Sequence, residues 1–213
     1  MAKEEPIITP LFATPLMSVQ LDLDTDKLTE LAFEMQNKDK KGADHTNRGG
    51  WQSNNIINEK HEEFIRLKKE IDQYLQIYHS EIFQGMEFKG NVTQQLFTMW
   101  ININEKHHYN EWHTHAFSTL SGVFYIKHDG SKELGAISFR HPAAGGFMRF
   151  IHWPVGIVTK SNEITSEIAG SGHESNTLLI FPSWLEHKVE INLKDDNRIS
   201  LSFNAQPSLE KKS

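Results

Sequence analysis

The spacing of apolar residues in this chain changes near Gly90. Before this glycine, apolar side chains recur every three or four residues, which is the spacing of a helix face. After it, the stretch 96–103 has an apolar residue at every odd position, and a period of two is typical of strands. The sequence therefore predicts an α+β fold, mainly β, with the helices first.

Two helices are expected in the first part of the chain. Asp24 and Thr25 are candidate N-caps for the first, whose apolar stripe is Leu28, Leu31, Ala32 and Met35. The second should begin near Asn58 and stop at Gly85. Its stripe is Phe64, Leu67, Ile71, Leu75, Tyr78 and Ile82. The stretch 6–19 holds three prolines among apolar residues and predicts an extended edge segment.

Short strands should follow the helices. They are expected at 96–103, 119–127, 134–140, 147–152, 177–181, 187–192 and 198–204. Many short strands favour a β-sandwich or barrel. We expect one domain over 1–213, with an N-terminal part of 1–90 and a β core of 91–206. The Gly- and Ser-rich stretch 142–176 predicts a long loop over one end of the barrel.

Composition excludes several classes of function. The chain has 213 residues, 38% hydrophobic and 23% charged, and its formal charge of −6 gives no basic footprint for nucleic acid. No apolar run is long enough to cross a membrane, and the first residues have no signal-peptide core. There is no cysteine, hence no disulfide and no thiolate metal site. A cytoplasmic protein is expected, with a homodimer only as the commonest oligomer.

Histidine is the unusual residue, with twelve copies. His113 and His115 lie two residues apart, just ahead of the apolar run 119–127. In an extended backbone, residues i and i+2 point to the same side. The pair could therefore aim at one metal ion from the mouth of a strand. The alternative is two surface histidines in a loop.

A third histidine favours the metal. His187 shares a strand face with Val189 and Ile191, opposite Lys188 and Glu190, so it should point inward. Three imidazoles leave coordination positions open, as catalytic sites do. His107, His108, His173 and Glu111 are the competing candidate ligands.

The last strand has one apolar and one polar face. The polar face is Arg198, Ser200, Ser202 and Asn204, and the apolar face is Ile199, Leu201 and Phe203. The turn 194–197 is expected to join this strand to 187–192 as a hairpin. A polar strand face usually meets solvent, but the inward His187 next door favours a polar interior cavity.

Five motifs, in this order, carry a resemblance to a known family. They are Gly49-Gly50-Trp51-Gln52-Ser53, His113-Thr114-His115, Leu120-Ser121-Gly122-Val123-Phe124-Tyr125, Phe181-Pro182-Ser183-Trp184-Leu185-Glu186-His187, and Arg198-Ile199-Ser200-Leu201-Ser202-Phe203-Asn204. With them the chain resembles the Fe(II)/2-oxoglutarate-dependent oxygenases, most of all a subgroup common in cyanobacterial phages and marine bacteria. The resemblance implies a double-stranded β-helix, a jelly-roll core, preceded by two helices. If phage-encoded, the protein would work in the host cytoplasm.

The resemblance also implies a ligand set. The superfamily holds iron with His-x-Asp/Glu and a distal His. By position, His113 is the first ligand and His187 the distal one, while His115 stands where a carboxylate is expected. A neutral ligand there leaves more of the metal charge uncompensated, so His115 either ligates or leaves a water in its place. We expect ligation.

The resemblance implies 2-oxoglutarate as cosubstrate, with O2, in the hydroxylation of an unnamed substrate. Arg198 matches the residue that clamps the far carboxylate, and Ser200 lies on its face. Tyr125 and Asn102 are weaker candidates for the same pocket. A salt bridge from Arg198 to Asp195 or Asp196 is the structural alternative.

Two other readings stay open. Three histidines and a water also make a catalytic zinc site, which would suit a cupin-like hydrolase or lyase. A non-catalytic metal-binding phage protein is the other. The primary substrate is not named by the sequence, although Arg149, His152, Trp153 and Pro154 in the loop 142–176 are expected to shape its pocket.

Overall fold

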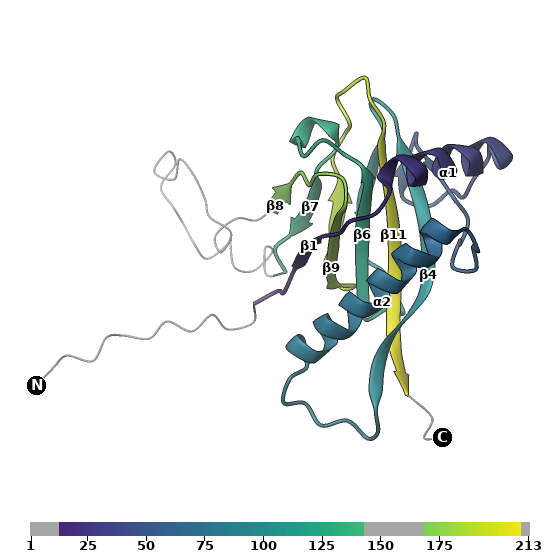
Figure 1. Cartoon of the computed structure of the whole chain (residues 1–213). Helices are drawn as coiled ribbons and strands as arrows, with labels where there is room; N and C mark the ends of the chain where they lie inside the picture. The colour runs from purple at the N-terminus through teal and green to yellow at the C-terminus, as the bar shows by residue number, and fades with distance from the viewer. Residues whose placement is uncertain (1–12, 143–167, 210–213) are drawn as a thin grey trace, which may run out of the picture.

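The computed structural model describes residues 13–142 and 168–209 (Figure 1). Its helices are α1 (Thr25–Lys38), α2 (Glu62–Ile82) and the short 3-10 helix η1 (Lys132–Leu134). Its strands are β1 (Met17–Gln20), β2 (Asn47–Arg48), β3 (Trp51–Gln52), β4 (Val92–Asn104), β5 (Tyr109–His113), β6 (Leu120–Lys127), β7 (Ile137–Arg140), β8 (Ile168–Ser171), β9 (Thr177–Pro182), β10 (His187–Val189) and β11 (Arg198–Leu209). None of the helices in these ranges is long and apolar enough to cross a membrane.

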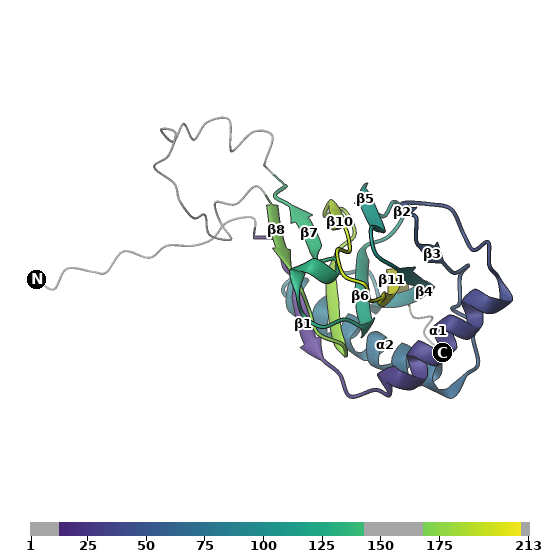
Figure 2. The same cartoon turned by 90° about the horizontal axis from the view of Figure 1, so that it is seen from above.

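The strands form two antiparallel sheets that face each other (Figure 2). The larger sheet has the order β1-β9-β6-β11-β4-β3, and the smaller has the order β2-β5-β10-β7-β8. Both α-helices cover the outer face of the larger sheet (Figure 2). The predicted fold, a mainly β jelly-roll core preceded by two helices, is confirmed.

Alternation along the central strands divides the core in two. Leu201 and Phe203 of β11 pack toward the helices, in a cluster that includes Leu67 of α2. Side chains of the opposite parity point between the sheets. The inter-sheet cluster is smaller: Val123, Tyr125, Ile137, Phe139, Leu179, Phe181 and Leu185. Apolar residues therefore fill only part of the space between the sheets, which leaves room for a polar cavity.

The helix-facing core should dominate stability. Leu67 is fully buried, whereas Ile65, two residues earlier on α2, is 51% exposed. Leu67→Ala is expected to lower the free energy of unfolding by about 2–5 kcal/mol, through lost burial and the cavity left behind. Urea unfolding measures it, with Ile65→Ala as the control. Equal losses in the two variants would contradict this assignment of the core.

Both helices and the N-terminal edge are as predicted, with small shifts. Asp24 caps α1, its side chain accepting from the Lys27 N–H at 2.9 Å. The second helix begins at Glu62 rather than near Asn58. β1 lies at the edge of the larger sheet, as the Pro-rich segment predicted, and residues 6–12 lie outside the described ranges.

The predicted hairpin between the last two strands is wrong. β10 pairs with β5 and β7, whereas β11 pairs with β4 and β6 in the other sheet. β10 also ends at Val189, and Ile191 is 47% exposed. The buried Asn192 side chain donates to the carbonyls of Asn104 and Asp196, at 3.1 and 2.7 Å. These hydrogen bonds give the two backbone carbonyls a donor where the chain crosses from one sheet to the other. The local sequence does not reveal this crossing.

Other differences concern short elements. β2, β3, β5 and β8 were not predicted, because two to five residues carry little periodic signal. The 3-10 helix η1 includes Leu134, the first residue of the strand expected at 134–140, and β7 begins only at Ile137. The loop expected over 142–176 contains β8. The strand expected at 147–152, with Arg149, His152, Trp153 and Pro154, lies outside the described residues.

Candidate active site

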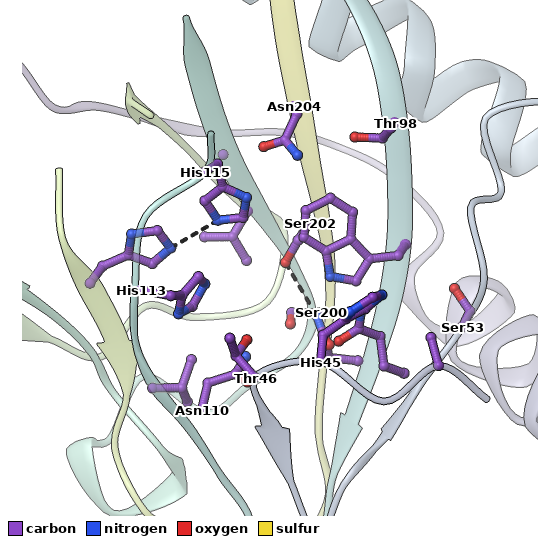
Figure 3. A pocket seen from close by; sticks show the side chains of 18 of the residues that line it. His45, Thr46, Ser53, Thr98, Asn110, His113, His115, Ser200, Ser202 and Asn204 are labelled. Atoms are coloured by element: carbon purple, nitrogen blue, oxygen red, sulfur yellow. Dashed lines mark hydrogen bonds between the residues drawn. The ribbon is translucent and has the colours of Figure 1, made fainter. Parts of the chain in front are cut away.

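A cavity of about 410 Å³ lies between the two sheets (Figure 3). The larger sheet lines it with the polar face of β11 (Arg198, Ser200, Ser202, Asn204) and with Thr98, Trp100 and Asn102 of β4. The smaller sheet contributes His113 and His187, and the loop after β5 contributes His115. The predicted interior polar face of the last strand is thus confirmed as a cavity wall.

The three predicted metal ligands meet at this cavity. One ligand atom from each of His113, His115 and His187 lies within 4.8 Å of the other two. Nε2 of His115 and Nε2 of His187 are 3.3 Å apart. The ring centroid of His113 is 4.3 Å from that of His187 and 5.0 Å from that of His115. The fold therefore brings together residues separated by more than seventy positions.

The strand that places these histidines differs from the one expected. His113 ends β5 and pairs directly with His187, the first residue of β10. His115 follows in the loop, where its backbone N–H donates to the Ser183 carbonyl at 3.0 Å. The histidine pair therefore closes an unpredicted strand instead of opening the strand at 119–127. Register in the smaller sheet, together with this loop contact, positions the cluster.

Backbone carbonyls orient two of the rings. Nδ1–H of His113 donates to the Glu111 carbonyl at 2.7 Å, and Nδ1–H of His187 donates to the Leu185 carbonyl at 2.8 Å. A neutral imidazole carries one proton, so each Nε2 keeps its lone pair. Metal-binding histidines commonly have this arrangement, with the second nitrogen held by a carbonyl.

Burial keeps the cluster neutral. It is the main cause that lowers the pKa of His187 to about 3 and that of His115 to about 4, and it also lowers the pKa of His113. Neighbouring histidines lower the pKa of His115 and His187 further. At neutral pH all three rings are therefore uncharged and can donate lone pairs.

The competing ligands stay outside the cluster. The Glu111 carboxylate forms an ion pair with Arg48 at 2.7 Å. His107 is exposed, and Nδ1 of His108 accepts from the Glu105 N–H at 3.0 Å. His173 Nε2 hydrogen-bonds the Ser171 hydroxyl at 2.8 Å. Within the described ranges, no carboxylate completes the histidine cluster.

Arg198 is a buried cation in the same cavity. It is 2% exposed, and its Nε–H donates to the Gly135 carbonyl at 3.1 Å while Nη1–H donates to the Ser200 hydroxyl at 2.8 Å. The alternative partners are engaged elsewhere, since Asp195 pairs with Lys106 and Asp196 with Lys127. Of the described residues, none offers this guanidinium a carboxylate. An uncompensated buried charge is costly, so the site is suited to an anion.

Of the two weaker candidates, Tyr125 lies beside this arginine but is not among the residues that line the cavity, and Asn102 pairs with Ser200 across β4 and β11. The Arg198 guanidinium carbon is 5.2 Å from the centre of the Tyr125 ring. Burial raises the pKa of Tyr125, so its hydroxyl keeps its proton, and among the described residues it has no hydrogen-bond acceptor. Asn102 lines the cavity and donates from Nδ2 to the Ser202 hydroxyl at 3.2 Å.

A further buried histidine, His128, carried no signal in the sequence. It follows β6 directly, and its ring centroid is 5.2 Å from that of Tyr125. Its Nδ1 accepts from the Gly130 N–H at 3.0 Å, so Nε2 carries the proton of the neutral ring. Burial is the main cause that lowers the pKa of His128 to about 4.

The pKa of His128 predicts a pH-dependent stability. The unfolded chain takes up a proton near pH 6.5, whereas the folded ring resists it down to about pH 4. Stability therefore falls as pH drops through this window, by about 1–2 kcal/mol between pH 7 and 5 for this group. Urea unfolding of metal-free wild type and His128→Gln tests this. The variant should lose less on acidification; identical losses would refute the assignment.

The residues fit a divalent metal and a dicarboxylate. Two nitrogens bound to one ion at about 2.0–2.2 Å lie roughly 2.8–3.6 Å apart for bond angles of about 90–110°. The separation of 3.3 Å between the His115 and His187 nitrogens falls within that range. Three neutral nitrogens suit iron and zinc alike. The buried Arg198 favours an iron site that uses a dicarboxylate over a hydrolytic zinc site, because the planar guanidinium presents a pair of donors that matches a carboxylate.

Comparisons with known proteins agree with this chemistry. Residues 98–204 match the family model described as "Putative 2OG-Fe(II) oxygenase". None of the curated proteins matches the chain.

Several solved structures share the fold. A prolyl-4-hydroxylase from Pseudomonas putida has a TM-score of 0.60 and 15% identity, covering 92% of this chain and 95% of that one. HygX from Streptomyces hygroscopicus, with nickel, 2-oxoglutarate and hygromycin B bound, has a TM-score of 0.60 and 13% identity, covering 91% and 83%. The epimerase SnoN, in complex with Fe3+, alpha ketoglutarate and nogalamycin RO, has a TM-score of 0.63 and 13% identity, covering 93% and 82%.

Proposed function

Since this chain belongs to the 2OG-Fe(II) oxygenase family, and so uses Fe(II), 2-oxoglutarate and O2, we propose that it hydroxylates an organic substrate in the cavity between its sheets. We assign His113, His115 and His187 as the iron ligands. Arg198 and Ser200 would bind the far carboxylate of 2-oxoglutarate, with Tyr125 and Asn102 beside them.

One observation carries this assignment. A buried arginine without a carboxylate partner among the described residues shares one cavity with three neutral histidines. A hydrolytic zinc site has no need of a buried guanidinium that clamps a dicarboxylate. A protein that only bound metal would have no reason to bury this charge, which costs several kcal/mol when it is unpaired.

The chain's contribution to the reaction is binding and positioning. Bound Fe(II), with 2-oxoglutarate and O2, supplies the oxidising power that places a hydroxyl on a C–H bond. His113 and His187 are held by backbone carbonyls, so their Nε2 atoms need no reorientation to meet the metal. Arg198 is fixed by Gly135 and Ser200, and its charge acts strongly on a ligand because the guanidinium is buried.

Anaerobic titration tests the proposal directly. Adding Fe(II) and then 2-oxoglutarate to the full chain should produce a visible charge-transfer band, and admitting O2 should produce succinate. The control is oxalate in place of 2-oxoglutarate, which cannot yield succinate. Binding of zinc with hydrolytic activity and no 2-oxoglutarate consumption would favour the zinc alternative, and metal binding alone would favour the non-catalytic one.

His115 is the assignment that most needs its own test. We expect His115→Ala to weaken Fe(II) binding at least about tenfold, because one of three nitrogens is removed, which corresponds to about 1.4 kcal/mol. His115→Asp should retain binding, since an aspartate supplies an anionic ligand at the same place. The measurement is Fe(II) affinity by anaerobic competition with a chelator. Unchanged affinity in His115→Ala would mean that water occupies this position.

We also propose that the protein works in the cytoplasm. The absence of cysteine from the sequence is in keeping with a reducing compartment. Localisation of a tagged full chain in the cells that express it tests this.

A further inference from the structure

The cavity has a second polar end, away from Arg198, formed by Thr98, Trp100, Ser202 and Asn204 (the far strip). We propose that the far strip binds the substrate, and that this substrate is an uncharged, hydroxyl-rich compound such as a sugar or cyclitol. The proposal rests on the function assigned above, in which Arg198 is occupied by 2-oxoglutarate.

The cavity is long enough for a second ligand beside 2-oxoglutarate. Arg198 and Asn204 lie six residues apart on β11, which is about 20 Å along a strand. Thr98 pairs with Asn204 and Trp100 with Ser202, so the far strip crosses both strands at the same level. A five-carbon acid bound at Arg198 is much shorter than this. Figure 3 shows Thr98 and Asn204 at one end of the cavity and Asn110 and Thr46 at the other.

The far strip has hydrogen-bonding capacity that the described protein groups do not use. The Thr98 hydroxyl is buried without a partner in the described residues. Asn204 accepts the Ser121 hydroxyl on Oδ1 at 2.8 Å, which leaves its amide NH2 available. The Ser202 hydroxyl oxygen accepts a hydrogen bond from Asn102, and the hydroxyl proton remains available as a donor. The Thr98 hydroxyl is buried, whereas Ser202 and Asn204 are half-buried. Polar groups in such places are rarely left unpaired, so these atoms are suited to a ligand that offers donors and acceptors together.

Charge decides the class of that ligand. Of the described residues that line the cavity, none is Asp, Glu or Lys, and Arg198 is the one arginine. A carboxylate, phosphate or ammonium group at the far strip would therefore have no charged partner among these described residues. Leaving a charge unpaired in such a place costs several kcal/mol. This disfavours nucleotides and amino acids and favours a neutral compound.

Aromatic contact and position point to a ring. The indole of Trp100 lies 5.7 Å from the His115 ring, tilted by 31°, so it borders the metal cluster. Rings with C–H faces and polar edges pack on indole while their edges hydrogen-bond. A hydroxyl both donates and accepts, so one ring can satisfy Thr98, Ser202 and Asn204 together, whereas an amide offers each role on one side only.

Binding of matched probes tests the proposal without turnover. The full chain, loaded with Zn(II) and 2-oxoglutarate, is titrated with neutral hexoses and inositols, and with the corresponding uronates and amino sugars. Calorimetry and tryptophan fluorescence are the readouts. We expect at least one neutral probe to bind, at least tenfold more tightly than its charged counterparts. Binding of a uronate or amino sugar as tight as its neutral counterpart, or no binding of any neutral probe, would overturn the proposal.

Variants locate the probe. Thr98→Val keeps the shape and removes the hydroxyl, so binding of the neutral probe should weaken about three- to tenfold. Thr98→Ser should retain it, and Thr93→Val, on the same strand but outside the cavity, is the matched control. Equal probe affinity in wild type and Thr98→Val would overturn the placement. The 2-oxoglutarate affinity of each protein is measured in parallel. If wild type does not bind 2-oxoglutarate, the proposed function is refuted. If wild type binds 2-oxoglutarate but does not prefer neutral probes, only the assignment of the far strip is refuted.

Discussion

Replacing His187 by alanine is expected to abolish metal binding and, with it, chelation of 2-oxoglutarate. His187 is buried, and its Nε2 lies 3.3 Å from that of His115. Its loss removes the one buried ligand of the three and leaves two half-buried ones, one of them in a loop, where water competes for the ion. The His187→Ala variant should therefore show no charge-transfer band and produce no succinate at Fe(II) concentrations that saturate wild type.

The matched control for this variant is His107→Asn. His107 is exposed and has a φ of 70°, a left-handed conformation that asparagine tolerates. It should keep wild-type Fe(II) affinity. Circular dichroism and urea unfolding of His187→Ala establish that the variant folds. A folded His187→Ala that binds Fe(II) as wild type does would remove the three-histidine site.

Replacing Arg198 by alanine should have a different signature. Metal binding is expected to stay nearly intact, because Arg198 is not a ligand. Affinity for 2-oxoglutarate should fall by the value of a buried, charged hydrogen-bonded pair, about 2–5 kcal/mol, or roughly thirty- to several-thousand-fold. Arg198→Lys should recover only part of this, because a point charge does not reproduce the guanidinium fork. Calorimetric titration with 2-oxoglutarate, with Zn(II) bound, measures the affinity of wild type, Arg198→Ala and Arg198→Lys.

Arg48→Ala is the control for the loss of a guanidinium. Arg48 pairs with Glu111, and its side chain is 41% exposed, so its removal should leave 2-oxoglutarate affinity unchanged. Equal cosubstrate affinity in wild type and Arg198→Ala would make the arginine structural. The zinc enzyme and the non-catalytic protein would then be the leading alternatives.

Features that depend on the local hydrophobic period could be predicted from the sequence. The stripe of α2 and the alternation along 96–103 and 198–204 each select one face for the apolar core between the helices and the larger sheet, since side chains packed there have no polar partners. The same alternation placed Arg198, Ser200, Ser202 and Asn204 on one face, and that face lines the cavity. The direction of His187 was predictable for the same reason, although its partner Ile191 is exposed.

Which strand faces meet depends on long-range pairing and could not be predicted from the sequence. The sequence placed β10 and β11 in one hairpin, yet they lie in opposite sheets, because pairing is chosen by the whole set of strands rather than by the turn between two. β5 is too short to show a period, yet its pairing with β10 puts His113 opposite His187. The proximity of His128 to Tyr125 comes from packing at the end of β6. Such contacts join residues distant in sequence, so no local pattern encodes them. Arg198 likewise becomes buried, without a carboxylate partner among the described residues, only once both sheets have closed around it.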